Sequence, residues 1–209
     1  MRFWLNRRTR MNAHQIRLYF FSCGMALAAN LAVAQQRPVT ISHVRSGHAQ
    51  LLQQGRLTIL ELASSGSPVQ RIALSHPSDY WQGTNGPFDA LLIAESPHHF
   101  LIFTDTFDSN PGNPQGQCGA SEAGDRTGER FVHVVSLGAV PHETLSVLVE
   151  SCLLDLEPTS TSPEWVAKPD SAGSVGQLVL RFEHGTQPTT LYYVSLDGAV
   201  TRPKIKPNP

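Results

Sequence analysis

The sequence predicts an all-β fold: an antiparallel β-sandwich or a partly open barrel of about nine strands, with little helix after the N-terminal segment. Short apolar runs, rich in β-branched and aromatic residues, alternate with clusters of Gly, Pro, Ser and Asn. After the N-terminal segment, no region shows a sustained apolar stripe with the 3.6-residue period of a helix. Regularly spaced strands without crossover helices favour antiparallel sheets over a parallel α/β arrangement.

Nine runs are the candidate strands, and turn residues bound nearly all of them. They span residues 57–62, 69–74, 89–95, 100–107, 130–137, 144–156, 177–184, 189–196 and 199–202. The region 47–55 is ambiguous and could form a short helix instead.

Two places in the last third of the chain have a clear local pattern. Leu178, Leu180 and Phe182 alternate with polar residues and Val179, which predicts one face toward the core and one toward water. The pair Asp197-Gly198 separates the last two runs and predicts a hairpin with a type I′ turn.

The run 144–156 changes phase along its length. Its apolar residues share one face up to Val149, whereas Leu154 and Leu156 fall on the opposite parity. A β-bulge close to Cys152 would return them to the apolar face, so we expect one there.

Residues 1–34 have the features of a secretory signal peptide. Five arginines precede a hydrophobic stretch, and residues 1–34 contain no acidic residue. The stretch ends in Ala32-Val33-Ala34, a pattern of small residues that predicts cleavage before Gln35. Met11 is an alternative start that keeps the hydrophobic stretch intact. The mature chain is then a single β-rich domain over 35–201, with a flexible tail over 202–209.

Three other interpretations of the N-terminal segment fit less well. A membrane anchor needs about 20 apolar residues, more than this stretch offers. Arg7-Arg8 lacks the apolar pair that follows a twin-arginine signal, and Cys23 is preceded by a poor match to a lipoprotein signal. We therefore expect a periplasmic or secreted protein.

Removal of the signal changes the net charge. The whole chain has 16 Lys and Arg against 17 Asp and Glu, a net charge of −1, and the mature part keeps 11 against 17, a net charge of −6. This balance argues against nucleic acid or an anionic membrane surface as a partner. It fits a cationic protein partner, such as a basic toxin or lysozyme, and it is also ordinary for a soluble protein.

The mature chain keeps two cysteines, Cys118 and Cys152. In an oxidising compartment two cysteines most simply form one disulfide. The alternative is two independent buried thiols.

Two segments have the composition of a binding surface. Residues 108–129 form the longest irregular stretch, and long ordered loops often carry function. Residues 78–88 combine Tyr and Trp with glycines, which suits contact with a protein or a sugar ring. The candidate partner-binding residues are Tyr80, Trp81, Phe88, Asp108, Asn110, Asn113, Gln117 and Glu122. Trp81 could instead fold back onto the sandwich, and Trp165 has the same two interpretations.

No catalytic set is recognisable in the sequence. A hydrolase could use dispersed residues, with Ser121, Glu122, Asp105, Asp108 and the histidines as material. A calcium site would use Asp105, Asp108, Asn110 and Asn113, but the full EF-hand pattern is absent.

Eight histidines follow residue 34, and no pair has zinc-type spacing. The sequence therefore predicts no metal and no cofactor, although a cluster assembled in three dimensions from distant residues stays open. His98 and His99 are expected on opposite faces of a strand. His133 and His184 occupy apolar positions of strands, which favours buried histidines with satisfied hydrogen bonds.

Three functions compete. The first is a non-catalytic exported domain that binds a protein or an envelope glycan, in the manner of an inhibitor or immunity protein. The second is an envelope hydrolase with a dispersed Ser/His/acid site. The third is a structural or assembly component that accepts partners at strand edges.

Overall fold

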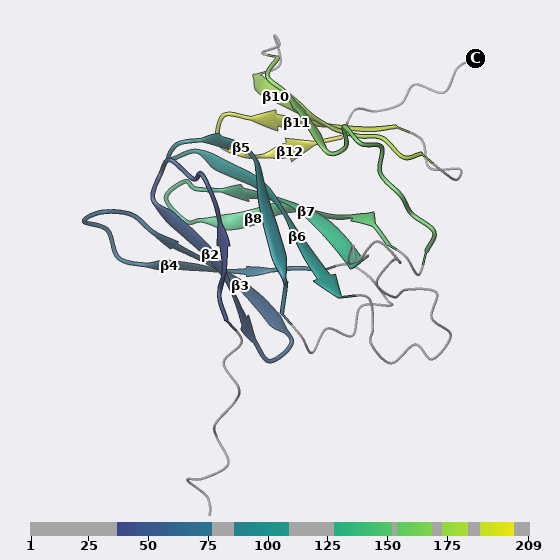
Figure 1. The fold of residues 1–209 in the computed structure, drawn as a ribbon. Helices are drawn as coiled ribbons and strands as arrows, with labels where there is room; N and C mark the ends of the chain where they lie inside the picture. Colours follow the sequence, from purple (N-terminus) through teal and green to yellow (C-terminus); the bar gives the residue numbers. More distant parts are fainter. Residues whose placement is uncertain are drawn as a thin grey trace, which may run out of the picture. The chain divides into compact units, whose positions relative to one another are not determined.

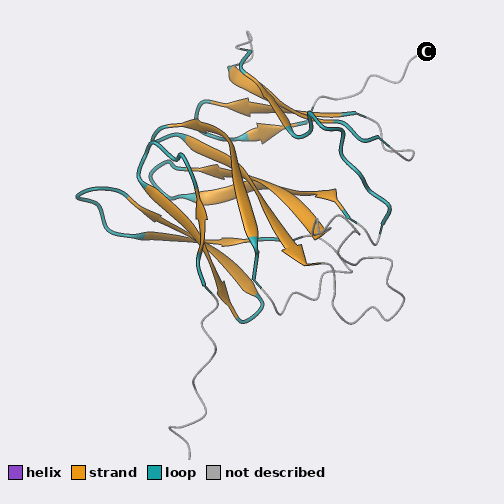
Figure 2. Cartoon of the chain, viewed as in Figure 1, coloured by secondary structure: helices purple, strands orange, loops and turns teal. Residues whose placement is uncertain are grey.

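The computed structural model describes residues 37–76, 86–108, 128–151, 154–168, 173–183 and 189–202. The chain divides into two units, residues 1–35 and 36–209, and all described residues belong to the second. They form strands, turns and loops without helix (Figure 2). Accordingly, this part of the chain contains no helix that could cross a membrane.

The described residues contain three four-stranded antiparallel sheets, each made of consecutive strands (Figure 1). The first sheet contains β1 (Val39–Ile41), β2 (His48–Gln54), β3 (Leu57–Ala63) and β4 (Gln70–Leu74). The second contains β5 (Asp89–Ser96), β6 (Phe100–Asp108), β7 (Gly128–Ser136) and β8 (His142–Glu150). The third contains β9 (Glu164–Val166), β10 (Ser174–Leu180), β11 (Thr190–Ser195) and β12 (Val200–Thr201), in the order β12-β11-β10-β9.

The second sheet is the middle layer, because each of its faces contributes to a separate apolar core. Leu101, Phe103 and Val135 pack with residues of the first sheet. Phe100, Ile102, Val132 and Val134 pack with Leu178, Leu180 and Val194 of the third sheet. A sheet that is buried on both faces needs nearly continuous apolar strands, which explains the run Phe131 to Val135, interrupted only by His133.

The first and second sheets approach each other along both edges, since β1 lies beside β5 and β4 lies beside β8. The third sheet ends in β9 and β12, which have three and two residues. Such short edge strands offer little backbone to an incoming strand.

The structure confirms the all-β class and shows twelve strands among the described residues, more than the expected nine. Each of the nine candidate runs overlaps one strand. The largest difference is in β8, which ends at Glu150, whereas the run extends to residue 156. The region 47–55 is a strand, β2, and the helical alternative is wrong, because Ala49 and Leu51 alternate into the core. Strands β1 and β9 have three residues each and were not among the candidate runs. β12 is shorter still, but the Asp197-Gly198 turn before it marks its position.

The bulge expected near Cys152 lies earlier in the chain. Phe131 pairs with Leu148 and Arg130 with Glu150, so the extra residue of β8 is Val149. The strand ends at Glu150.

The reversal of phase that suggested the later bulge comes from a turn. Ser151 and Leu156 exchange two backbone hydrogen bonds of 2.9 Å, and Asp155 between them has a φ of 50°. Leu154 and Leu156 therefore follow the strand and do not extend its apolar face.

Two turn predictions also need correction. The hairpin at Asp197-Gly198 is present, but only Gly198 has a positive φ, so a type I turn followed by a left-handed glycine replaces the expected type I′ turn. His98 has a φ of 65°, and His99 N donates to Ser96 O over 2.9 Å. Both histidines therefore belong to the β5–β6 turn and not to a strand.

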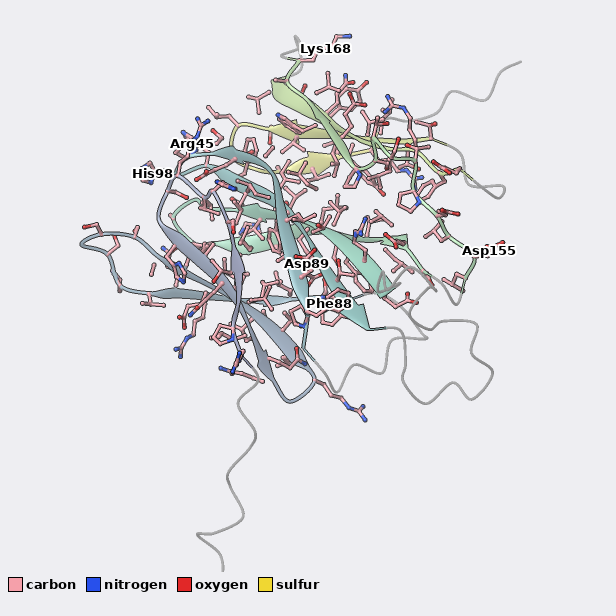
Figure 3. All side chains as sticks on the ribbon, in the orientation of Figure 1. Arg45, Phe88, Asp89, His98, Asp155 and Lys168 are labelled. Carbon is pink, nitrogen blue, oxygen red and sulfur yellow. The ribbon has the colours of Figure 1, made fainter. Side chains whose placement is uncertain are left out.

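One end of the middle sheet is defined by where its strands start and stop. Phe88 N donates to Thr106 O, Asp108 pairs with Gly128, and strand β8 ends in register with the start of β7. We call the end marked by Phe88, Asp108, Gly128 and Glu150 the Phe88 end. Figure 3 shows Phe88 and Asp89 at this end of β5 and His98 beyond the other.

Candidate functional site

Five polar residues form a connected row between the first sheet and the middle sheet. They are Ser75, His76, Asp105, His133 and Glu143. The side chains of Asp105 and His133 are fully buried, that of His76 is 2 % exposed, and that of Glu143 is 12 % exposed. Burying two carboxylates is costly unless they are paired, so the contacts within the row decide its stability.

Each member of the row bonds to the next. His76 Nε2 donates to Asp105 Oδ2 over 2.9 Å, and His133 Nε2 donates to Asp105 Oδ1 over 3.0 Å. His133 Nδ1 donates to Glu143 Oε1 over 2.6 Å. The Ser75 hydroxyl and, over 2.9 Å, the Ser75 amide donate to Glu143 Oε2.

The alternation of strands β6 and β7 places the centre of the row. Asp105 has the parity of Phe103 on β6, and His133 has the parity of Val135 on β7, so both side chains face the first sheet. Phe103 pairs with His133, and Asp105 pairs with Phe131. Asp105 and His133 are therefore diagonal neighbours on one face.

A second bulge in β8 brings in Glu143. Val134 pairs with Leu145 and Val135 pairs with Glu143, which leaves Thr144 as the extra residue. Beyond the bulge Leu145 packs toward the third sheet, whereas Glu143 reaches His133 on the opposite face. A β-bulge changes the direction of a side chain in this way.

The end of β4 supplies the remaining two members. Ser75 and His76 follow β4 directly, where it lies beside β8. The Ser146 hydroxyl donates to the carbonyl of Ser75, which adds to the bonds between Ser75 and Glu143. These contacts hold the backbone before His76 against the middle sheet.

Aromatic rings surround the two imidazoles. The ring of His76 meets Phe107 and Phe131 edge-on, with centroids 4.8 Å apart in both cases. Phe103 stacks on His133 at 5.2 Å. This apolar surrounding keeps the local dielectric low and strengthens the charge–charge interactions within the row.

His133 carries a positive charge in this arrangement. Carboxylates only accept hydrogen bonds, so both ring nitrogens of His133 hold protons. Burial by itself lowers the pKa of His133, but the charge of Asp105 and the hydrogen bonds to Asp105 and Glu143 outweigh burial and raise this pKa to about 9. Burial likewise acts to raise the pKa of Asp105, and the charge and hydrogen bonds of His133 and His76 lower it overall.

The row lacks the geometry of a serine hydrolase. A Ser-His-Asp site needs the hydroxyl on an imidazole, whereas the Ser75 hydroxyl bonds to the Glu143 carboxylate. Two carboxylates and two imidazoles in a buried site can instead hold protons or a cation.

The prediction for His133 as a buried histidine with satisfied hydrogen bonds is confirmed. Sequence reasoning considered Asp105, but only among dispersed residues, and nothing in the sequence singled out His76, Ser75 or Glu143. The usable signal was a charged residue and a histidine at apolar positions of neighbouring strands. The bulge that brings in Glu143 has no comparable mark in the sequence.

Most predicted partner-binding residues lie outside the described residues. These are Tyr80, Trp81, Asn110, Asn113, Gln117 and Glu122. The two cysteines of the predicted disulfide, Cys118 and Cys152, also lie outside the described residues, as do Ser121 and His184. Phe88 is half-buried just before β5, and Asp108 is the last residue of β6. The row joins Asp105 to histidines, which departs from the calcium arrangement considered from the sequence.

The indole ring of Trp165 packs against the third sheet and the middle sheet. Its ring lies 5.6 Å from that of Phe100 and covers Gly176, where a Cβ atom would be 2.3 Å from the indole. One side of Trp165 also borders an open groove of 590 Å³ with His43 and Glu95. Of its two interpretations, the described contacts favour packing.

No protein-family model matches this chain, and no curated protein and no solved structure is significantly similar to it.

Proposed function

We propose that this chain is an exported β-domain, periplasmic or secreted, that binds a macromolecular partner and does not catalyse a reaction. The partner class that we favour is a protein, bound in the manner of an inhibitor or immunity protein. The binding surface is the Phe88 end, with the two connections that leave it.

The observation that supports this proposal is that two long connections join strands at the same end of the middle sheet. Residues 77–85 connect β4 to β5, and residues 109–127 connect β6 to β7. Their described anchors, Phe88, Asp108 and Gly128, lie on neighbouring strands at the Phe88 end. Connections from one end of a rigid sandwich commonly carry recognition residues, because the sheets fix where they start and stop.

The charge of the domain favours a basic partner. After removal of residues 1–34 the net charge is −6, which speeds encounter with a cationic protein and disfavours nucleic acid. Tyr80 and Trp81 would then be the anchors of the contact, since large aromatic residues dominate binding energy at interfaces.

Export is supported by the N-terminal sequence. The arginine-rich start, the apolar stretch and Ala32-Val33-Ala34 fit cleavage before Gln35. N-terminal sequencing of the protein recovered from the envelope fraction tests this part, with Gln35 expected as the first residue. Recovery of an intact residue 1 or 11 from that fraction would contradict cleavage.

Photo-crosslinking tests the binding surface in the full chain. A photoreactive amino acid replaces Trp81 in one version and Val140 in another, and both are expressed from the chain's own start. Val140 is a matched control because it is 77 % exposed and lies in the β7–β8 connection, away from the Phe88 end. Irradiation of whole cells precedes isolation and mass spectrometry.

We expect one protein adduct of basic character from position 81 and none from position 140. The same adduct from both positions, or no adduct from position 81, overturns the choice of surface. Adducts with glycan alone would reject a protein partner and favour the envelope glycan.

A further inference from the structure

We propose that His76, Asp105 and His133 form a binding site for one divalent transition-metal ion of the borderline class, such as Zn²⁺. Each residue offers one ligand atom, and these atoms all lie within 4.8 Å of one another. His76 follows β4, Asp105 belongs to β6 and His133 belongs to β7, so the site has no characteristic spacing in the sequence. This goes beyond partner binding and departs from the expectation of no metal.

The donor arrangement is close to that of a metal site. The two oxygens of Asp105 face the Nε2 atoms of His76 and His133 at 2.9 and 3.0 Å. With metal–ligand distances of 2.0–2.1 Å, donors around a tetrahedral ion lie about 3.3 Å apart. Donors up to 4.8 Å apart therefore need to converge by about 1.5 Å at most to hold a tetrahedral ion.

An outer shell around His133 is the second, independent observation. Histidines that bind metal commonly donate their other ring N–H to a carboxylate, which fixes the ring and raises its basicity. His133 Nδ1 donates to Glu143 over 2.6 Å, and Ser75 holds Glu143 through its amide and hydroxyl. This carboxylate is therefore itself oriented before any ion arrives.

The charges of the row also match a divalent ion. Asp105 and Glu143 bring two negative charges into a site surrounded by Phe103, Phe107 and Phe131. Binding of the ion displaces the Nε2 proton of His133 to solvent, while Nδ1 keeps its proton and its bond to Glu143. One divalent ion with two neutral imidazoles then balances both carboxylates. Imidazole nitrogens suit Zn²⁺, Ni²⁺ or Cu²⁺, whereas Mg²⁺ and Ca²⁺ prefer all-oxygen sites.

Titration of the full chain with ZnCl₂ tests the site. The protein carries no histidine tag, is treated with chelator, and is measured by calorimetry and, after desalting, by elemental analysis. We expect one Zn²⁺ per chain, and no binding of MgCl₂ or CaCl₂ at the same concentration. Wild-type protein that retains no Zn²⁺ overturns the proposal without reference to any variant.

Variants separate this site from the surface histidines. His76→Gln should lose more than about 100-fold in Zn²⁺ affinity, and Glu143→Gln should lose about 10–100-fold. His142→Gln is the control, because His142 is exposed and hydrogen-bonds to Val140. Equal affinity in His76→Gln and the control would assign the ion to surface histidines and reject the site.

A spectroscopic measurement covers the case in which His76→Gln fails to fold. Wild-type protein loaded with Co²⁺ should show the strong visible absorption of a four-coordinate ion, held by the three side chains with a water as the fourth ligand. Weak absorption typical of six-coordinate, water-rich Co²⁺ would overturn the proposal.

Discussion

The carboxylate of Asp105 lies 3.0 Å from Nε2 of His133, and both side chains are fully buried between two β-sheets. The two residues belong to neighbouring strands of the middle sheet, β6 and β7. Their contact ties the polar row to the best-buried part of the fold. The stability of the metal-free protein should therefore report on this pair directly.

The first prediction concerns pH. The pKa of His133 is raised to about 9 in the folded protein, so its contribution to stability is complete below its unfolded value near 6.5. That contribution is lost as the pH rises through about 9 and amounts to roughly 3 kcal/mol. The lowered pKa of Asp105 adds a second loss, in acid below its ordinary value near 4.

Urea unfolding in the presence of chelator at several pH values between 5 and 10 measures the first loss. The free energy of unfolding should fall in the alkaline half of this range for the wild type. The decline should be much smaller in His133→Gln, if that variant folds. A wild-type curve that stays flat up to pH 10 would contradict a charged His133.

The second prediction concerns Asp105→Asn. The amide nitrogen of asparagine would face an imidazole N–H, so one of two hydrogen bonds is replaced by two opposed donors. Breaking a buried pair in this way costs about 3–5 kcal/mol. Urea unfolding at pH 7 with chelator measures the cost. Asp155→Asn is the control, because Asp155 is exposed and asparagine accepts its φ of 50°.

The third prediction concerns the contact between Gly176 of β10 and Trp165 of the edge strand β9. In Gly176→Ala the new Cβ would lie 2.3 Å from the ring of Trp165 and 2.8 Å from the carbonyl of Val166. Overpacking of this kind costs about 1–3 kcal/mol. Gly138→Ala, whose Cβ would meet only Ser136 Oγ at 3.7 Å, should change the melting temperature little.

A double variant refines this test. Trp165→Leu removes the ring, so Gly176→Ala should cost less in that background than in the wild type. Equal costs in both backgrounds would show that the indole is not the obstacle.

The fourth prediction concerns Cys118 and Cys152. Cys118 belongs to the connection between β6 and β7, which ends where β7 starts at Gly128. Near that point Arg130 of β7 pairs with Glu150, the last residue of β8, and Cys152 is two residues further along the chain. A disulfide closing this loop would add about 4 kcal/mol. Peptide mapping without reductant should recover the two cysteines in one linked peptide. Recovery as separate thiols would contradict the bridge.

The sequence was sufficient for the fold class because strands leave a strong local signal. Runs such as 100–107 and 130–137 combine β-branched and aromatic residues with turn residues at both ends, and both are strands. β9 has three residues, too few to show an alternating pattern. The division into three layers also escaped prediction, since it depends on which strand faces which.

The site was harder to predict because its members meet only through the fold. His76 and Asp105 are 29 residues apart, and their contact depends on β4 lying beside β8. Glu143 reaches His133 because of a bulge at Thr144, a position with no turn residue to mark it. Register and layer packing, which decide these contacts, are properties of pairs of strands.

The arrangement of consecutive strands within each sheet has a consequence for how the chain acquires its structure. Each sheet can pair from neighbouring residues as soon as they are available, which favours rapid local assembly. One face of the middle sheet, however, bears Ile102, Val132 and Val134 and is covered by strands β10 and β11, which come late in the sequence. Until β10 and β11 have been synthesised and have docked, this apolar face stays uncovered and is prone to self-association. Chains truncated after β8 should therefore aggregate on refolding, and the 209-residue chain should scatter less light under the same conditions.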